Sequence, residues 1–163
     1  MTTDAAQYHP LPQPAEVSIR EKEDAMGAYL MMFAAIGAGL PLPIINLIAS
    51  IVYYYLNRSA SRFVRFHSMQ SLYSQIPVTL LNAGVIMWTI KNLIRGGHFS
   101  DSFWGYLAMV VIANIVYFIF SIIAAVKARR GYLYYFIFFG KVCYENVFRI
   151  RSLQENAVNK PPF

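Results

Sequence analysis

The run Gly37-Ala38-Gly39-Leu40-Pro41-Leu42-Pro43 interrupts an apolar stretch that covers residues 25–56. As one straight helix this stretch would be about 48 Å long, whereas the hydrocarbon core of a bilayer is about 30 Å thick. Two prolines two residues apart remove helix hydrogen bonds and clash with the preceding turn. The run therefore predicts two short helices, residues 25–38 and 43–56, joined by a Gly/Pro turn.

Charged residues are scarce in this chain and unevenly placed. They make up 13% of the 163 residues, about half the share of a soluble domain, while 57% are hydrophobic. No carboxylate occurs between Asp24 and Asp101. This pattern excludes an ordinary cytosolic domain and an active site of paired carboxylates in the middle of the chain. It predicts a small multi-pass membrane protein.

Two further apolar segments, residues 68–90 and 103–126, are each long enough to cross a bilayer. The expected fold is all-α: an integral membrane protein with four transmembrane helices, the first two short, and a C-terminal interfacial amphipathic helix. The predicted organisation is a polar N-terminal tail (1–24), a four-helix transmembrane domain (25–131), an interfacial aromatic helix (132–151) and a C-terminal tail (152–163).

The interfacial helix is predicted from residues 132–151. Eight apolar or aromatic residues, 132–139, are followed by Lys141 and Glu145, which come too soon for a fifth span. On a helix, Lys141, Glu145 and Arg149 line one side at four-residue spacing. This pattern predicts a helix lying on the cytoplasmic leaflet, with a docking helix for a partner as the alternative.

The basic residues flank the apolar segments, and the formal net charge is +6. Such placement favours a topological role over nucleic-acid binding. It puts the loop 57–67 and the C-terminal tail in the cytoplasm. The double proline favours four spans over three, and with four spans the N-terminal tail lies in the cytoplasm too. We expect a bacterial inner-membrane protein that contacts anionic lipid of the cytoplasmic leaflet and no nucleic acid.

Arg58, Arg62 and Arg65 recur at four- and three-residue spacing in the basic loop. A helical turn here would place all three on one face. They serve either as positive-inside anchors or as a contact for anionic lipid or a partner.

A polar stripe runs along the segment 68–90. Its members recur every three or four residues and are Ser68, Ser71, Gln75, Thr79 and Asn82. Unpaired polar groups are costly in lipid, so the stripe must face protein or water. Interhelical hydrogen bonding and the lining of a wet conduit are the two interpretations, with Asn46, Ser50, Asn114 and Ser121 as candidate partners.

No catalytic, cofactor or metal site is expected from the sequence. Cys143 is the single cysteine, and His67 and His98 would lie roughly 46 Å apart on a continuous helix. There is no phosphate-binding loop and no hydrolase or metalloprotease motif. The protein is therefore not expected to be an enzyme, although His67 beside Arg65 keeps a membrane-surface enzyme as a third reading.

The run Phe63-Val64-Arg65-Phe66-His67-Ser68-Met69-Gln70-Ser71 resembles a motif of small bacterial four-helix membrane proteins of unassigned function. That family is similar to the twenty-kilodalton component of the chloroplast inner-envelope protein translocon (Tic-twenty-like). Residues 123–132 resemble the end of its fourth helix. The resemblance covers residues 25–136. It implies a compact four-helix bundle with His67 and Gln70 near the cytoplasmic mouth of the third helix.

The leading hypothesis is a non-catalytic accessory or scaffold subunit of a larger inner-membrane complex, with protein translocation the process that the resemblance suggests. The alternative is a self-contained small channel or transporter lined by the polar stripe. The third reading is the membrane-surface enzyme that uses His67.

Overall fold

A computed structural model describes residues 8–34 and 43–150 of the chain. This part contains α1 (Ile19–Leu30), the 3-10 helix η1 (Met31–Phe33), α3 (Pro43–Leu56), α4 (Arg62–Ile94), α5 (Asp101–Arg129) and α6 (Phe139–Phe148). Apart from one isolated bridge, the described residues form no β structure, so the all-α prediction is confirmed. Residues 37–42 of the predicted Gly/Pro turn lie outside the described residues. The predicted tail 152–163 lies outside them too.

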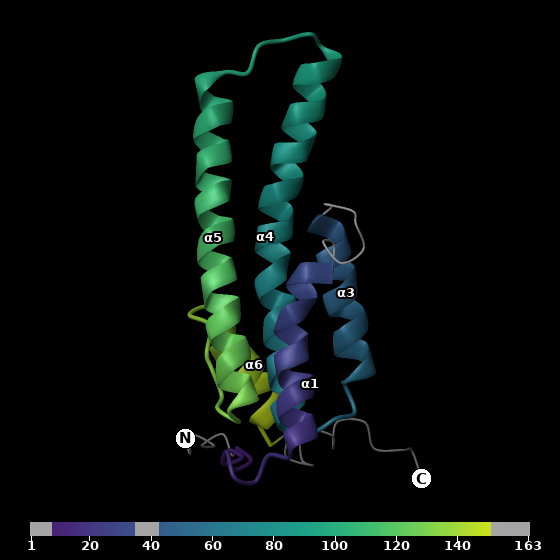
Figure 1. Cartoon of the computed structure of the whole chain (residues 1–163), viewed down its shortest axis with the longest axis vertical. Helices are drawn as coiled ribbons and strands as arrows, with labels where there is room; N and C mark the ends of the chain where they lie inside the picture. The colour runs from purple at the N-terminus through teal and green to yellow at the C-terminus, as the bar shows by residue number, and fades with distance from the viewer. Residues whose placement is uncertain (1–7, 35–42, 151–163) are drawn as a thin grey trace, which may run out of the picture.

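The helices α4 and α5 form a long antiparallel hairpin that runs the length of the molecule (Figure 1). They contain 33 and 29 residues, and in the described part they are the two helices long and apolar enough to cross a membrane. α4 begins at Arg62 rather than at residue 68, because Ser61 caps it by accepting from the Val64 amide. It continues through Pro77 to Ile94.

The helices α1 and α3 lie beside only one half of this hairpin (Figure 1). A Cβ atom on Gly27 of α1 would lie 2.6 Å from the hydroxyl oxygen of Tyr53, so the glycine permits close packing against α3. α1 has 12 residues and α3 has 14, fewer than the roughly 20 that a transmembrane helix needs. The described residues therefore supply two helices of transmembrane length where four were predicted.

The start of α1 also differs from the prediction, since the helix begins at Ile19 within the segment expected to be a tail. The cause is a capping box. The Ser18 hydroxyl accepts from the Glu21 amide at 3.3 Å, and the Ser18 amide donates to the Glu21 carboxylate at 2.8 Å. These bonds start the helix before the apolar stretch does.

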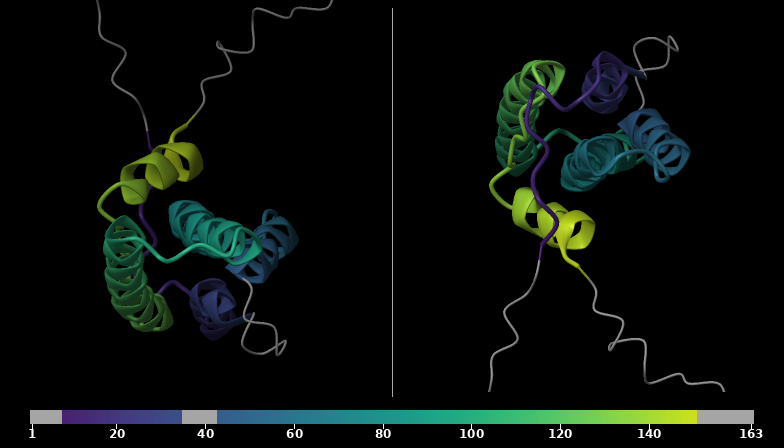
Figure 2. Two further views of the ribbon diagram at one scale, coloured as in Figure 1. Left: turned by 90° about the horizontal axis from the view of Figure 1, so that it is seen from above. Right: turned by 90° about the horizontal axis from the view of Figure 1, so that it is seen from below.

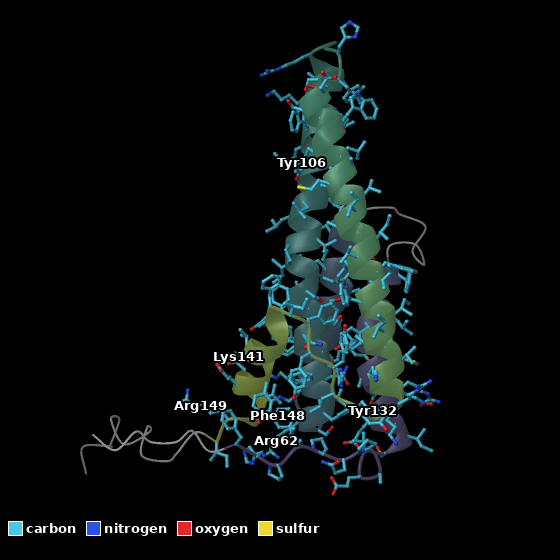
Figure 3. The ribbon with its side chains drawn as sticks, turned by 90° about the vertical axis from the view of Figure 1, so that its left-hand side faces the viewer. Arg62, Tyr106, Tyr132, Lys141, Phe148 and Arg149 are labelled. Carbon is cyan, nitrogen blue, oxygen red and sulfur yellow. The ribbon has the colours of Figure 1, made fainter. Side chains whose placement is uncertain are left out.

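The C-terminal segment is not the single interfacial helix predicted for residues 132–151. Gly131, at φ +83°, follows the end of α5, and α6 covers only Phe139–Phe148. Between them, residues 132–138 run back along the hairpin, and α6 then returns, so that Phe148 lies closer to the end of the molecule than Lys141 does (Figure 3). The aromatic run thus forms a connection and a short helix packed on α4.

One end of the molecule, here called the basic end, carries the start of α1, the 57–61 loop, the start of α4 and the end of α5 (Figure 1). The described N-terminal segment, residues 8–18, crosses this end from α6 to α1 (Figure 2). The amide of His9 donates to the Phe148 carbonyl at 2.8 Å, and the ring of Tyr8 stacks on Tyr144. The opposite end is the loop 95–100, here called the tip.

The described hydrophobic core lies in the half of the molecule at the basic end. One cluster joins α1, α4 and α5, and a second joins α4 to α6. Their buried members are Val17, Ala25, Tyr29, Phe63, Val64, Ala124, Ala125 and Ala128 in the first, and Phe66, Met69, Cys143, Val147 and Phe148 in the second.

Candidate functional site

The first turns of α4 contain the most enclosed polar side chains of the described residues. Phe63 and Val64 pack toward α1 and α5, while Phe66 and Met69 pack toward α6. His67 and Gln70 lie between these two apolar clusters, and both are completely buried. The pair lies in the first turns of α4, near the basic end, and neither side chain reaches the surface.

A continuous hydrogen-bond chain joins His67 to Gln70 through Tyr29 of α1. The Tyr29 hydroxyl oxygen lies 2.9 Å from His67 Nδ1 and accepts from Gln70 Nε2 at 2.9 Å. The Tyr29 hydroxyl, which also accepts from Gln70, donates its hydrogen to Nδ1 or accepts one from it according to the imidazole tautomer. The main chain of Tyr132 faces the ring, but Nε2 has no hydrogen bond of good geometry.

Gln70 also binds the irregular segment that precedes α6. Its Nε2 donates to the Tyr134 carbonyl at 2.7 Å, and its Oε1 accepts from the Phe136 amide at 3.2 Å. The Gln70 side-chain amide thus forms the hydrogen bonds that another peptide group would otherwise form. It forms them with two backbone groups that lie outside any helix. This pairing explains why residues 132–138 are not helical although their side chains are apolar.

The polar stripe faces the other helices. The Ser71 hydroxyl donates to the Ala28 carbonyl of α1 at 2.7 Å, and Thr79 is nearly buried. Gln75 is 2% exposed and its amide has no hydrogen-bond partner among the described residues, although the Tyr117 hydroxyl of α5 faces it.

Asn82 is the member of the stripe nearest the tip. It pairs with Asn114 of α5, one of the partners named from the sequence. Each side-chain amide donates to the other's oxygen, at 3.1 and 3.2 Å. Each also donates to the carbonyl four residues earlier in its own helix, from Asn82 to Val78 and from Asn114 to Val110. The two amides therefore satisfy one another between the helices.

The three arginines do not share one helix face. Arg58 precedes α4, Arg62 is its first residue, and Arg65 lies one turn later. Arg58 and Arg62 are exposed, and Arg62 Nη2 lies 3.2 Å from Nε2 of His9 in the crossing segment. Arg62 therefore has a contact within the chain, while Arg58 remains available at the surface of the basic end.

A hollow of about 280 Å³ lies between α4, α5 and the segment before α6. Its walls are apolar, from Pro77 and Val78 on α4 to Val116 and Phe120 on α5. Within residues 8–34 and 43–150, no group of three or more His, Cys, Asp and Glu side chains is close enough to hold a metal ion.

Sequence reasoning missed two parts of this site. Tyr29 lies in the apolar stretch 25–56 and carries no polar signal there, although its hydroxyl links His67 to Gln70. The main-chain groups of Tyr134 and Phe136 bond to Gln70, and no side-chain pattern in the sequence predicts these bonds. The start of α1 did have one, because the Ser18-x-x-Glu21 spacing is that of a capping box.

The described part of the chain is all-α and contains two helices that are long and apolar enough to cross a membrane. A family model covers residues 22–142, and the chain belongs to this family, the magnetosome magnetite crystal formation protein family (MamF/MmsF). No curated protein and no solved structure matches the chain.

This membership corrects the expected resemblance to the family similar to the chloroplast translocon component, because the matching family is a different one. The role in protein translocation that the resemblance suggested is not supported. The motif of residues 63–71 has a physical explanation within this bundle: Phe63, Val64, Phe66 and Met69 fill the two core clusters.

Proposed function

We propose that this protein is a non-catalytic membrane component of magnetite crystal formation, held in the magnetosome membrane by α4 and α5. The family match over residues 22–142 carries the role in magnetite formation, and the separation of charge along the hairpin supports the membrane placement. Residues 66–90 of α4 and 102–126 of α5 contain no Asp, Glu, Lys or Arg. Each segment is about 37 Å long, enough to cross the hydrocarbon core of about 30 Å.

In this placement the basic end faces the cytoplasm, in accord with the positive-inside rule, and the tip faces the compartment in which the crystal forms. We propose two full crossings instead of four. α1 and α3 are about 18 and 21 Å long, too short for the core, and they enter from the basic side to part of its depth.

A non-catalytic role is supported by the enclosure of His67, which is completely buried and hydrogen-bonded to Tyr29. The mutual pairing of Asn82 and Asn114 supports interhelical bonding in place of a conduit. We further propose that exposed Arg58 contacts anionic lipid and that the chain is an accessory subunit of a larger membrane complex. The mass of the intact species from mild detergent tests the last point: a stoichiometric partner supports it, and a lone monomer contradicts it.

The functional test is removal of the protein from a magnetosome-forming bacterium. We expect electron microscopy to show magnetite crystals of altered size or shape, and we expect the wild-type gene to restore normal crystals. We also expect an immunoblot to detect the protein in isolated magnetosome membranes. A Gln70→Leu gene is the matched control, because it disturbs the docking of residues 132–148 while leaving α4 and α5 in place. Unchanged crystals after removal would overturn the proposal.

A further inference from the structure

The described part of the molecule has very different widths at its two ends. Near the tip, α4 and α5 pack only against each other (Figure 1). Tyr106 of α5 donates to the Leu81 carbonyl at 2.9 Å and lies over Gly84, and the ring of Trp88 meets Phe103. The outer faces of this half are apolar and exposed, as at Met87 and Ile112.

At the basic end the same hairpin is flanked by α1, α3 and α6, while one side of α5 stays uncovered (Figure 2). α1 is bound to α5 by the Glu23–Arg129 ion pair at 2.7 Å and to α4 by Ser71. α3 packs on α1, with Tyr53 donating to the Asp24 carbonyl at 2.7 Å. α6 packs on α4 through Phe66 and Phe148.

The added elements end part of the way along the hairpin. The ring of Phe33, the last residue of η1, meets Phe118 near the middle of α5, with ring centroids 5.8 Å apart. The connection before α6 also turns back at this depth, where Ile137 and Phe138 are each 80% exposed. At helix diameters of about 10 Å, α1, α3 and α6 add roughly 240 Å² of cross-section to one half of the molecule.

We propose that this wedge shape, wide at the basic end and narrow at the tip, makes the protein a curvature-selective membrane component. It concentrates where the leaflet that holds the basic end is on the convex side of the membrane. The inference rests on the proposed crossing of the membrane by α4 and α5. A wide half in one leaflet and a narrow half in the other match a bilayer whose leaflets differ in area, as in a small vesicle or a narrow tube. In a flat bilayer, lipids around the narrow half must deform to fill the difference.

The sign of the effect provides the test. Arg58 at the basic end and His98 at the tip are both exposed, and Cys143, the single native cysteine, is buried. Arg58→Cys and His98→Cys proteins are reconstituted into giant vesicles and labelled from outside with a membrane-impermeant maleimide dye. The label then reports only molecules with the basic end outward, or only those with the tip outward. The wild type gives the background labelling.

Membrane tubes are pulled outward from these vesicles, and the protein signal is compared with that of a lipid dye. We expect severalfold enrichment in the tube for label at residue 58 and depletion for label at residue 98. Equal density in tube and vesicle for both labels, or a change of the same sign for both, would overturn the proposal.

Paired variants separate shape from general membrane affinity. Ile137→Ser with Phe138→Ser removes the apolar contact of the wide half, and we expect weaker enrichment of the residue 58 label. Leu93→Ser with Ile94→Ser changes two similarly exposed residues near the tip and should leave the enrichment unchanged. If the two pairs behave alike, the shape argument fails.

A protein that carries both cysteines checks the membrane placement separately. Labelling of one site per molecule from outside supports the crossing, and absence of sorting of the single-cysteine proteins then overturns only the curvature proposal. Labelling of both sites in one molecule overturns the crossing and, with it, the curvature proposal.

Discussion

The side chain of Gln70 on α4 donates to the main-chain carbonyl of Tyr134, across 64 positions of sequence, at 2.7 Å. The same amide accepts from the Phe136 amide, so one side chain fixes the course of the chain between α5 and α6. The docking of α6 against Phe66 and Met69 therefore depends on a residue in another helix.

Gln70→Leu should loosen α6 while leaving the α4–α5 hairpin intact. The Phe136 amide and the Tyr134 carbonyl would lose their partner, and an orphaned buried polar group costs about 1–3 kcal/mol. The reaction of Cys143 with a thiol reagent in detergent measures this, because α6 must open to expose it. Asn146→Ala is the control, since Asn146 is exposed on the same helix and bonds only to the Val142 carbonyl. Equal reactivity of the wild type and Gln70→Leu would contradict the proposed role.

Cys143 itself should be nearly inert in the folded protein at neutral pH. Burial raises the pKa of its thiol to about 12, and the thiolate is the reactive form. We expect slow labelling by maleimide in mild detergent and complete labelling after denaturation. Rapid labelling of the native protein would show that α6 is not packed as described.

Asn82 and Asn114 should be coupled in a double-mutant cycle. Either substitution by Leu leaves one amide with a reduced set of partners, at a cost of about 0.6–2 kcal/mol in a membrane helix pair. The double substitution should cost less than the sum of the single ones. Thermal unfolding midpoints in one detergent give the comparison, and additive shifts would exclude a direct interaction.

Three glycines allow backbone strain to be separated from steric contact. A Cβ at Gly131 would lie 3.1 Å from Cα of Pro14, and this residue has φ +83°. Gly96 has φ +59° with no atom within 4 Å, and Gly97 has open space without positive φ. The destabilisation by Ala should therefore fall in the order Gly131, Gly96, Gly97. The positive φ alone accounts for about 1–2 kcal/mol, and the unfolding midpoint reports it. An equal effect at Gly131 and Gly96 would rule out the Pro14 contact.

Acid below the usual pKa of a glutamate should loosen the start of α1. Hydrogen bonds from Ser61 and Ser18 lower the pKa of the Glu21 carboxyl below its usual value. The stabilisation is present above the pKa of a free glutamate and is lost as the pH falls through the lower folded-state pKa. Glu21→Gln should remove this pH dependence, whereas Glu16→Gln, outside the capping box, should retain it. Limited proteolysis between residues 13 and 25 across a pH series is the measurement.

The parts of the fold set by composition could be predicted, and the parts set by single contacts could not. The apolar runs led directly to α4 and α5, and the even spacing of the polar stripe led to a face turned toward other helices. The second short helix was predicted with the bounds that α3 has, 43–56, whereas the start of α1 was missed because apolar content alone set its predicted beginning. α1 in fact takes its first turn from polar residues capped by Ser18.

The candidate site was predicted by residue and missed by arrangement. His67 and Gln70 were singled out, but their enclosure follows from Tyr29 and from the main chain of residues 132–136. The aromatic run 132–139 has the composition of an interfacial helix. It does not form one because the buried Gln70 side chain hydrogen-bonds to its backbone. No periodicity in the run itself predicts these bonds.

The bridge between Tyr8 and Arg149 bears on the order of events during synthesis. Chains emerge from the ribosome N-terminus first, so residues 8–18 leave it long before their partners on α6 exist. Residues 8–18, although made before α6, thus find their place only after it. Until α6 emerges, Tyr8 and His9 lack Tyr144 and Phe148, and a chain stalled before α6 would keep this surface open to the quality-control machinery of the cell.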